Sequence, residues 1–496
     1  MAAPERGAPT SNHRRAGAEA DNGCVSDDEF DLVVLGAGSG GYACALRAAQ
    51  LGLRVALVER DLVGGTCLHY GCIPTKAILH AAEVADSARD GARFGVHSSV
   101  DKVDLAGVRS YAEGVVARLH KGLTGLISSR GITVVAGEGR LVPGAGTPAV
   151  AVTSADGERT LVAPHVVLAS GSQSKTLPGL VPDGERVLTS TDAIRLQTLP
   201  TSAVVLGGGV IGVELASAWR SFGVEVTVVE ALDRLVPGED PAASAALLRA
   251  FRKRGITVRT AGPVRSVETL PTGVRVALDD EAGTTLEADL VLVAVGRGPR
   301  SAGMGYEEAG VALDRGYVTV DERLRTSVPG VHAVGDLVLG LQLAHRGFAH
   351  GIFVAEDVAH AEGRLDRAPV LVPDEQIPRV TYCDPEVASV GLSEEVARAR
   401  YGDVETQTYD LAGNGKAQIL QTAGFVKLVR RTDGPVVGVH MVGARVGELI
   451  GEAQLVTSWE AWPDEVAALP HAHPTLDEAL GEAHLALAGR PLHAHR

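Results

Sequence analysis

One local pattern occurs twice in this chain and constrains the fold more than any other feature. In the first copy an apolar run leads into a glycine motif formed by Gly36, Gly38 and Gly41. A small-residue stretch with helical periodicity follows, and then a second apolar run, Val55–Val58, ends at Glu59. This order is typical of a dinucleotide-binding βαβ unit. The glycines let the backbone approach a pyrophosphate at a helix N-terminus, and the acid accepts hydrogen bonds from a ribose.

The second copy has its glycines at Gly207, Gly209 and Gly212 and its acid at Glu230. In both copies the acid follows the first glycine by 23 positions. A glycine-rich turn in some other βαβ unit is the alternative for one copy alone, but matched spacing makes chance much less plausible. The chain is therefore predicted to bind two dinucleotides.

The acid of the second copy bears on the choice of nicotinamide cofactor. Glu230 can bind a free ribose 2′-hydroxyl but would repel a 2′-phosphate. No arginine stands directly at the end of that strand, and Arg234 comes four residues later. The sequence therefore favours NAD over NADP.

Length and composition narrow the class of protein. A chain of 496 residues predicts about two to four domains. The net charge of −15 disfavours nucleic acid and anionic membranes as partners, and no apolar run reaches the roughly 18 residues of a transmembrane helix. Five cysteines do not make a secreted disulfide framework, so we expect a cytoplasmic protein. Residues 1–29 lack apolar periodicity and are predicted to form a disordered extension.

Two of the five cysteines, Cys67 and Cys72, lie in the segment GGTCLHYGCIPTK, residues 64–76. A zinc site is a poor fit because no second pair of Cys or His ligands follows. A structural disulfide would close a very small loop and add little stability. A redox pair is the interpretation that remains. Lys76 would then favour a thiolate or a reduced flavin anion, with an ordinary exposed lysine as the alternative.

A regular helix cannot carry this pair as a disulfide. Residues five apart on an α-helix rise roughly 7.5 Å and lie roughly 140° apart around the axis, so their Cα atoms are roughly 8–9 Å apart. A disulfide needs roughly 7 Å or less. If Cys67 and Cys72 are bridged, the helix must be distorted between them, and Gly71 can supply the distortion.

Three further strand patterns end in small or polar residues that suit a ligand site. They span His165–Ser172, Asp289–Arg300 and Val328–Leu337. The last one ends near Asp336, and a carboxylate at the carboxyl end of a strand can contact a ligand in an open α/β sheet. A turn or N-cap role is the alternative for Asp336.

The C-terminal region offers a candidate base among the sixteen histidines. His473 lies in a proline-flanked, irregular segment, and Glu478 follows near the start of a helical pattern. A histidine tuned by a carboxylate suits proton transfer, although a lone histidine is more often a surface residue. His471 is interpreted as a supporting residue and His484 as a solvated one.

Together these motifs resemble the flavin-dependent disulfide reductases. The resemblance rests on GGTCLHYGCIPTK, the two glycine motifs, AVGD at 333–336 and HAHPTLDEA at 471–479, and it covers about residues 30–490. The last motif narrows it to the dihydrolipoamide dehydrogenases. This implies an enzyme that oxidises protein-bound dihydrolipoamide to lipoamide with FAD and reduces NAD⁺ to NADH. Such enzymes serve 2-oxoacid dehydrogenase or glycine cleavage complexes.

The resemblance also implies roles for individual residues. Cys67 matches the thiol that exchanges with the substrate, and Cys72 matches the thiol that faces the flavin. His473 and Glu478 match an acid–base pair that reaches the neighbouring subunit's cysteines. The implied FAD contacts are Gly36, Gly38, Gly41, Glu59, Lys76, Gly139, Ser170, Gly171, Ser172, Asp336 and the segment of Gln342, Leu343, Ala344 and His345. The implied NAD contacts are Gly207, Gly209, Gly212, Glu214, Glu230 and Gly296, with Glu214 also pairing with Lys76.

The implied fold is α/β, with two Rossmann-like doubly wound nucleotide-binding domains, for FAD and NAD, and a C-terminal α+β dimerisation domain. We expect FAD-binding parts at 30–178 and 299–373, an NAD-binding domain at 179–298 and the interface domain at 374–496. Expected partners are a second copy of the chain and a lipoylated acyltransferase or carrier protein. No nucleic acid, membrane or metal is expected.

The chain departs from the family pattern at three places. Arg300 stands where relatives often have Asn, and LAHRGFAHG at 343–351, which contains Phe348, lacks the acidic residues usual after the histidine. Tyr70 occupies a position that varies among relatives. None of these changes removes a catalytic group, but they bear on the choice of dithiol and of multienzyme complex.

Rival functions make different demands on the sequence. A mercuric-reductase-like enzyme needs another cysteine pair near the C-terminus, whereas the last cysteine is Cys383. A glutathione reductase would prefer basic residues after the second glycine motif. Another flavin disulfide reductase acting on a different dithiol is the alternative within the class. A non-catalytic flavoprotein subunit would not need Cys67, Cys72 and His473 together.

Overall fold

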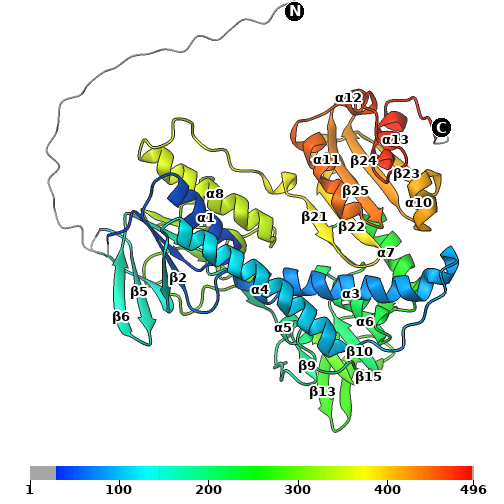
Figure 1. The fold of residues 1–496 in the computed structure, drawn as a ribbon, viewed down its shortest axis with the longest axis horizontal. Helices are drawn as coiled ribbons and strands as arrows, with labels where there is room; N and C mark the ends of the chain where they lie inside the picture. The colour runs from blue at the N-terminus through cyan, green and yellow to red at the C-terminus, as the bar shows by residue number, and fades with distance from the viewer. Residues whose placement is uncertain (1–28, 145, 494–496) are drawn as a thin grey trace, which may run out of the picture.

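The computed structural model describes residues 29–144 and 146–493, and these residues are dominated by three five-stranded sheets (Figure 1). Two sheets are parallel, with strand orders β20-β7-β1-β2-β3 and β12-β11-β10-β16-β9. In each, the strand that leads into a glycine motif is central. The third sheet is antiparallel. All of the predicted extension except Glu29, which bridges to Val162, lies outside the described residues.

The first parallel sheet combines strands from residues 32–168 with one strand, at 331–333, that comes much later in the chain. Its central strand, β1, has four buried apolar residues, as expected for a parallel strand covered on both faces. Helices α1 (Ser39–Gln50) and α8 (Ala344–Ala361) lie side by side over it (Figure 1). The strands are β1 (Leu32–Leu35), β2 (Val55–Glu59), β3 (Thr133–Ala136), β7 (His165–Leu168) and β20 (Val331–Ala333).

The second parallel sheet lies between β7 and β20 in sequence, so the chain leaves the first sheet and returns to it. The two connecting segments run side by side as an antiparallel ribbon of β8 (Ser172–Ser174) and β17 (Arg297–Pro299). The sheet comprises β9 (Val187–Leu188), β10 (Ser202–Leu206), β11 (Glu225–Val229), β12 (Thr257–Arg259) and β16 (Leu290–Val293), with α5 (Ser190–Ala193), α6 (Val210–Ser221) and α7 (Pro241–Lys253). Three antiparallel strands flank it: β13 (Val264–Leu270), β14 (Gly273–Leu278) and β15 (Thr285–Ala288).

The antiparallel sheet and its helices form the C-terminal region (Figure 1). Its strands β24 and β25 pair with one another. The strands are β21 (Arg379–Thr381), β22 (Glu386–Gly391), β23 (Val404–Asp410), β24 (Phe425–Arg431) and β25 (Val436–Gly443). The helices are α9 (Glu394–Tyr401), α10 (Gly415–Leu420), α11 (Val446–Ser458), α12 (Pro463–Ala467) and α13 (Glu478–Leu487).

The remaining elements connect these sheets. Helix α3 packs against both α4 and α6, and it thereby joins the two parallel sheets. Of the described helices, none is both long and apolar enough to cross a membrane. The remaining elements are α2 (Gly65–His69), α3 (Cys72–Asp90), α4 (Leu105–Ser129), β4 (Glu138–Val142), β5 (Ala149–Ser154), β6 (Gly157–Val162), β18 (Leu313–Asp314) and β19 (Tyr317–Val318).

Three predicted strands are shorter than their apolar patterns, including the one at 328–337, where β20 spans only Val331–Ala333. The strand expected at 165–172 ends at Leu168, and Gly171 beyond it has a φ of 72°. The pattern at 289–300 divides into β16 and β17 around Gly296, whose φ is 108°. These glycines turn the chain where it leaves the sheets, which an apolar count cannot detect. The proposed domain boundaries at 178, 298 and 373 stay predictions.

Candidate active site

The two glycine motifs adopt the same local geometry. A Cβ atom on Gly36 would overlap the Ala169 carbonyl, and one on Gly207 would overlap the Ala294 carbonyl. Both residues have positive φ, 105° and 106°. The middle glycine of the first motif, Gly38, has no heavy atom within 4 Å of the Cβ it lacks, and Gly209 is equally open. The outer glycines allow close packing, and the middle ones leave space for a ligand to approach the backbone.

The acids at the ends of β2 and β11 are held in matching ways. Glu59 accepts a hydrogen bond from the Ala37 N–H at 2.7 Å, and Glu230 accepts one from the Gly208 N–H at 2.6 Å. The other oxygen of Glu230 accepts from the Leu232 N–H at 2.7 Å. Each acid therefore orders the glycine turn beside it and keeps lone pairs for a ribose hydroxyl.

Both turns open into one cavity of about 1370 Å³. This exceeds the roughly 300–1,000 Å³ of a site for one small ligand. The predicted site residues that line it are Gly36, Gly38, Glu59, Cys67, Cys72, Lys76, Gly139, Ser170, Gly171, Ser172, Gly207, Gly209, Glu214, Glu230, Gly296, Asp336, Gln342, Leu343, Ala344 and His345. Gly41 and Gly212 lie behind their turns, where a Cβ would overlap the carbonyls of Gly36 and Gly207. His473 and Glu478 do not line the cavity.

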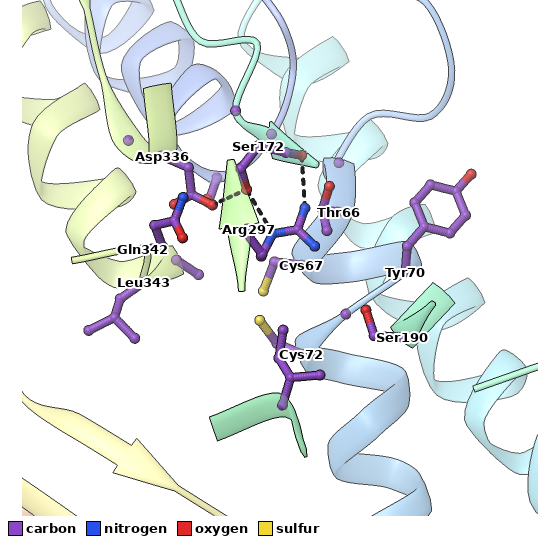
Figure 2. Close-up of a pocket in the computed structure, with 18 of the residues that line it drawn as sticks. Thr66, Cys67, Tyr70, Cys72, Ser172, Ser190, Arg297, Asp336, Gln342 and Leu343 are labelled. Carbon is purple, nitrogen blue, oxygen red and sulfur yellow. Dashed lines mark hydrogen bonds between the residues drawn. The ribbon is translucent and has the colours of Figure 1, made fainter. Parts of the chain in front are cut away.

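The two cysteines face one another at the junction of two helices (Figure 2). Helix α2 ends at His69 and α3 begins at Cys72, so the helix is interrupted between the sulfurs, as a disulfide would require. Gly71 provides the break, with φ −145° and ψ −106°. Both sulfurs are free thiols here and half-buried. Their approach allows exchange between a dithiol and a disulfide form.

The two thiols differ in acidity. A hydrogen bond from Cys67, aided by the charge of Lys76, lowers the pKa of Cys72 to about 7. The same hydrogen bond, together with burial, raises the pKa of Cys67. Cys72 is therefore the thiol that holds a negative charge near neutral pH.

A buried ion pair lies beside the cysteines. The Lys76 ammonium donates to both Glu214 oxygens, at 2.9 and 2.8 Å, and the Glu214 side chain is 3% exposed. Burial alone would lower the pKa of Lys76, but the Glu214 carboxylate outweighs it and raises that pKa. The Tyr382 N–H also donates to Glu214, at 2.9 Å, so the C-terminal region helps to fix the pair. No sequence motif predicted a role for Tyr382.

Arg297, for which no sequence motif predicted a role, points into the cavity near Cys67 (Figure 2). Its guanidinium donates to the Ser172 hydroxyl and carbonyl, both at 2.8 Å. The Ser172 hydroxyl in turn donates to Asp336 at 2.5 Å. The sequence feature that could have identified Arg297 is a charged residue directly after Gly296, where the strand pattern leaves the sheet.

The unusual segment at 343–351 has a structural explanation. Arg346 is buried and donates to backbone carbonyls in the loop from Gly335 to Leu341, and it pairs with Asp374 at 2.6 Å. The ring of Phe348 lies 5.5 Å from that of Tyr42. Arg346 thus holds the loop that carries Asp336, and the departures at these positions leave the cavity lining in place.

The predicted acid–base pair lies at the start of α13, in the C-terminal region. His473 Nδ1 and Glu478 Oε1 are 2.8 Å apart, and Glu478 also accepts from the Thr475 N–H at 2.9 Å. The His473 side chain is 77% exposed. The interpretation of His484 as solvated is wrong, since that residue is fully buried and bonded to the Leu480 carbonyl.

Comparisons with known proteins agree with this architecture. The family model described as pyridine nucleotide-disulphide oxidoreductase matches residues 30–351, and the dimerisation-domain model of that family matches 377–484. A dihydrolipoyl dehydrogenase of Bacillus subtilis is 39% identical over 94% of this chain and 99% of its own length. A leghemoglobin reductase of Vigna unguiculata is 38% identical over 94% of this chain and 89% of its own.

Solved structures show the same fold. LpdA from Mycobacterium tuberculosis is 30% identical and superposes with a TM-score of 0.85, covering 92% of this chain and 99% of that one. The Cu(II) complex of the HOCl-induced flavoprotein disulfide reductase RclA from Escherichia coli is 25% identical, with a TM-score of 0.81 and the same coverage. The predicted fold class, two nucleotide-binding domains with a C-terminal dimerisation domain, is confirmed.

Proposed function

This chain belongs to the pyridine nucleotide-disulphide oxidoreductase family, and from that premise we propose that it oxidises protein-bound dihydrolipoamide to lipoamide and reduces NAD⁺ to NADH. One observation carries the proposal: a single cavity joins two dinucleotide turns to the Cys67–Cys72 pair. A thiol couple placed between two nucleotide sites suits electron transfer from a dithiol to a nicotinamide.

The residues fit FAD at the first turn and NAD at the second. The open space at Gly38 and Gly209 lets a pyrophosphate reach each helix N-terminus, and Glu59 and Glu230 retain acceptor capacity for ribose hydroxyls. When bound, FAD accepts an electron pair from a thiolate and NAD⁺ accepts a hydride. Lys76 and Glu214 lie beside Cys72. Their pairing holds the positive charge of the Lys76 ammonium next to the Cys72 thiolate, which donates the electrons.

The dithiol half-reaction uses the chain's own sulfurs. In the oxidised protein Cys67 and Cys72 form a disulfide, and a substrate thiolate attacks the Cys67 sulfur. The S–S bond breaks, and its electron pair leaves on Cys72, whose low pKa makes it a good leaving group. The second substrate thiolate then attacks the substrate sulfur joined to Cys67. This closes the cyclic disulfide and releases Cys67.

Each attack requires a base to remove a thiol proton. His473, paired with Glu478, is the candidate, but it does not line the cavity of its own chain. The chain carries the dimerisation domain of its family. We therefore assign the base to His473 of a second copy, so that each active site is shared between two chains.

The partner and the location follow from the same reaction. A lipoyl group on a flexible carrier protein can enter an open cavity and leave it again, so the second substrate is a lipoylated acyltransferase or carrier. The proposed location is the cytoplasm, where thiols stay reduced between turnovers.

A steady-state assay of the purified yellow protein tests this function. NAD⁺ and NADP⁺ are compared, each with free dihydrolipoamide and with a lipoylated carrier domain. We expect turnover with NAD⁺ and dihydrolipoamide, a lower KM for the carrier-bound form, and little activity with NADP⁺. Reduction of glutathione disulfide or mercuric ion by NADH or NADPH, without oxidation of dihydrolipoamide by NAD⁺, would refute the proposal.

A further inference from the structure

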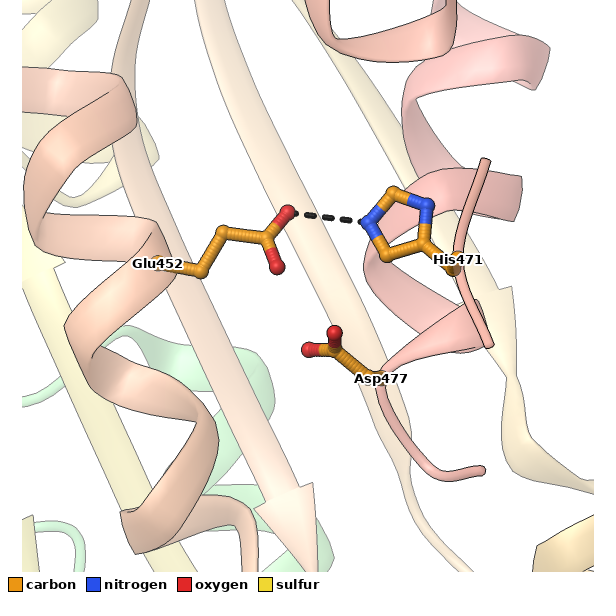
Figure 3. A group of neighbouring side chains, drawn as sticks. All are labelled: Glu452, His471 and Asp477. Atoms are coloured by element: carbon orange, nitrogen blue, oxygen red, sulfur yellow. Dashed lines mark hydrogen bonds and ion pairs between the residues drawn. The ribbon is translucent and has the colours of Figure 1, made fainter. Parts of the chain in front are cut away.

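Three ionisable side chains approach one another in the C-terminal region (Figure 3). They are Glu452 of α11, His471 in the segment before α13, and Asp477 immediately before α13. One potential ligand atom from each lies within 4.8 Å of the other two. His471 Nε2 donates to Glu452 Oε1 at 3.0 Å. The group lies outside the cavity, and the reaction above does not use it.

The cluster is more enclosed than the residue it supports. The His471 side chain is 10% exposed, against 77% for His473. The hydrogen bond to Glu452 raises the pKa of His471, which keeps the imidazole protonated towards neutral pH. Burial and the Glu452 carboxylate raise the pKa of Asp477. The buried His484 of α13 also faces Glu452 and completes the titratable groups around it.

The chain places this cluster at both ends of the reactive segment. His471 comes two residues before His473, and Asp477 comes one residue before Glu478. Both therefore approach Glu452 from either side of His473, and Glu478 follows Asp477 directly. Between them, the Thr475 carbonyl accepts from the Asn414 amide at 3.0 Å. His471 is tied to Glu452 by their hydrogen bond, and Asp477, whose pKa is raised beside Glu452, must be protonated to donate to the same carboxylate.

Helix α13 is shaped to receive the His471 ring. A Cβ atom on Gly481 would overlap the ring at Nδ1. Gly481 lies within the helix, where glycine costs about 1 kcal/mol relative to alanine. The space left by the missing side chain is thus filled by the imidazole that reaches Glu452. This contact is independent of the polar contacts in the cluster.

We propose that Glu452, His471 and Asp477 act as a clamp that positions the His473–Glu478 pair for proton transfer. The three are positioning residues, and none of them touches the reacting atoms. This inference rests on the proposed role of His473. Within its own chain the exposed His473 imidazole gains little orientation beyond its contact with Glu478, so the backbone that carries it must be fixed, because small misplacements of a catalytic group cost rate steeply.

The test compares variants of the full-length dimer. Glu452→Ala and His471→Ala remove the clamp, and Gly481→Ala displaces the ring while leaving every polar group. His471→Gln keeps a side-chain donor. Asp464→Asn, which alters an exposed ion pair with Arg490 in the same region, serves as the control. For each variant we measure kcat and KM for dihydrolipoamide, NADH oxidation by ferricyanide, the dimer fraction and the thermal midpoint.

We expect kcat with dihydrolipoamide to fall roughly 10-fold in the two alanine variants and in Gly481→Ala. His471→Gln should recover most of the loss. NADH oxidation by ferricyanide needs no thiol base and should stay unchanged. Wild-type kcat in all three clamp variants would overturn the clamp, as would losses that follow the dimer fraction or the thermal midpoint. A wild-type protein inactive with dihydrolipoamide would instead refute the proposed function.

Discussion

Two pairs in this chain each join a basic side chain to a glutamate carboxylate at the same N···O distance, but they differ in their exposure to solvent. Lys76 and Glu214 are 2.8 Å apart beside the cysteines, and His473 and Glu478 are 2.8 Å apart at the start of α13. The side chains of Lys76 and Glu214 are 31% and 3% exposed, whereas those of His473 and Glu478 are 77% and 23% exposed. A single chain therefore largely encloses the first pair, whereas it leaves the histidine of the second pair open to solvent.

The difference shows which part of the site is preformed. An exposed pair adds only about 0–1 kcal/mol to stability, so folding alone gives little reason for His473 and Glu478 to meet. The buried pair has no such freedom, because separating its members would leave a charge unpaired in the interior. Disruption near Lys76 should thus affect folding and chemistry together. Disruption at His473 should affect chemistry alone.

The sharpest test of the preformed half removes its sulfurs. Cys67→Ser and Cys72→Ser should each lower dihydrolipoamide oxidation by roughly 10³-fold or more, since each removes a reacting atom. Visible spectra should distinguish them, because Cys67→Ser keeps the thiolate of Cys72 beside the flavin. Cys44→Ser, at a buried cysteine away from the cavity, is the control and should stay active. Identical spectra in the two inactive variants would contradict the division of roles.

The open half is tested at its base. His473→Ala should keep the fold and FAD, while dithiol oxidation falls by roughly 10²-fold, the usual range for a lost general base. Glu478→Gln should lose less, because it orients the imidazole and raises its basicity. Steady-state rates together with flavin content measure both effects. A large fall in the thermal midpoint of His473→Ala would instead show that this pair stabilises the fold.

Mixing subunits asks whether the two halves come from different chains. Cys67→Ser and His473→Ala homodimers are both inactive by expectation. After subunit exchange, a mixed dimer has one site with both groups intact and one with neither, so activity should partly return. The exchange itself is followed with differently tagged subunits. No recovery after verified exchange would place both groups of a site in one chain.

The matched acids of the two glycine turns provide a smaller effect. Glu230→Ala should raise the KM for NAD⁺ by about 10-fold, because a charged hydrogen-bond acceptor is lost, and should leave FAD content unchanged. Glu59→Ala should do the reverse, loosening FAD without changing the KM for NAD⁺. Each variant is the control for the other. Equal effects of both changes on both cofactors would mean that the turns are not independent sites.

The smallest expected effect is a shift in the titration of Cys72. With its pKa lowered to about 7, the reduced protein should hold mostly thiolate above that pH and lose it as the pH falls below. Cys67→Ala removes the hydrogen-bond donor and should move the midpoint upwards, whereas Cys67→Ser keeps a donor and should move it less. Ultraviolet thiolate absorbance followed against pH measures the midpoint. An unchanged midpoint in Cys67→Ala would show that Lys76 alone sets the acidity.

Much of the site could be predicted because its signals are local. Gly36 and Gly207 need positive φ and close approach to a neighbouring strand, which only glycine allows. The helix break between Cys67 and Cys72 follows from their spacing and from Gly71. These requirements act over a few residues, so they leave a readable pattern in the chain.

The missed residues act across long separations. Arg297 meets Ser172 and Arg346 meets Asp374 only because the chain returns to earlier strands and loops. The prediction that His484 is solvated was wrong. Helix α13, which carries it, packs against strands of the antiparallel sheet and buries this residue. The sequence separation between such partners follows no rule, so a local motif does not reveal them.

By itself, the sequence determined two dinucleotide turns, a redox pair and a candidate base, since each depends on local backbone geometry or on residue chemistry. Only the tertiary structure decided that both turns share one cavity, that the Tyr382 N–H meets Glu214 although 168 residues apart, and that His473 does not line the cavity that holds the cysteines of its own chain. The physical reason is that burial and charge pairing depend on which surfaces the folded chain brings together.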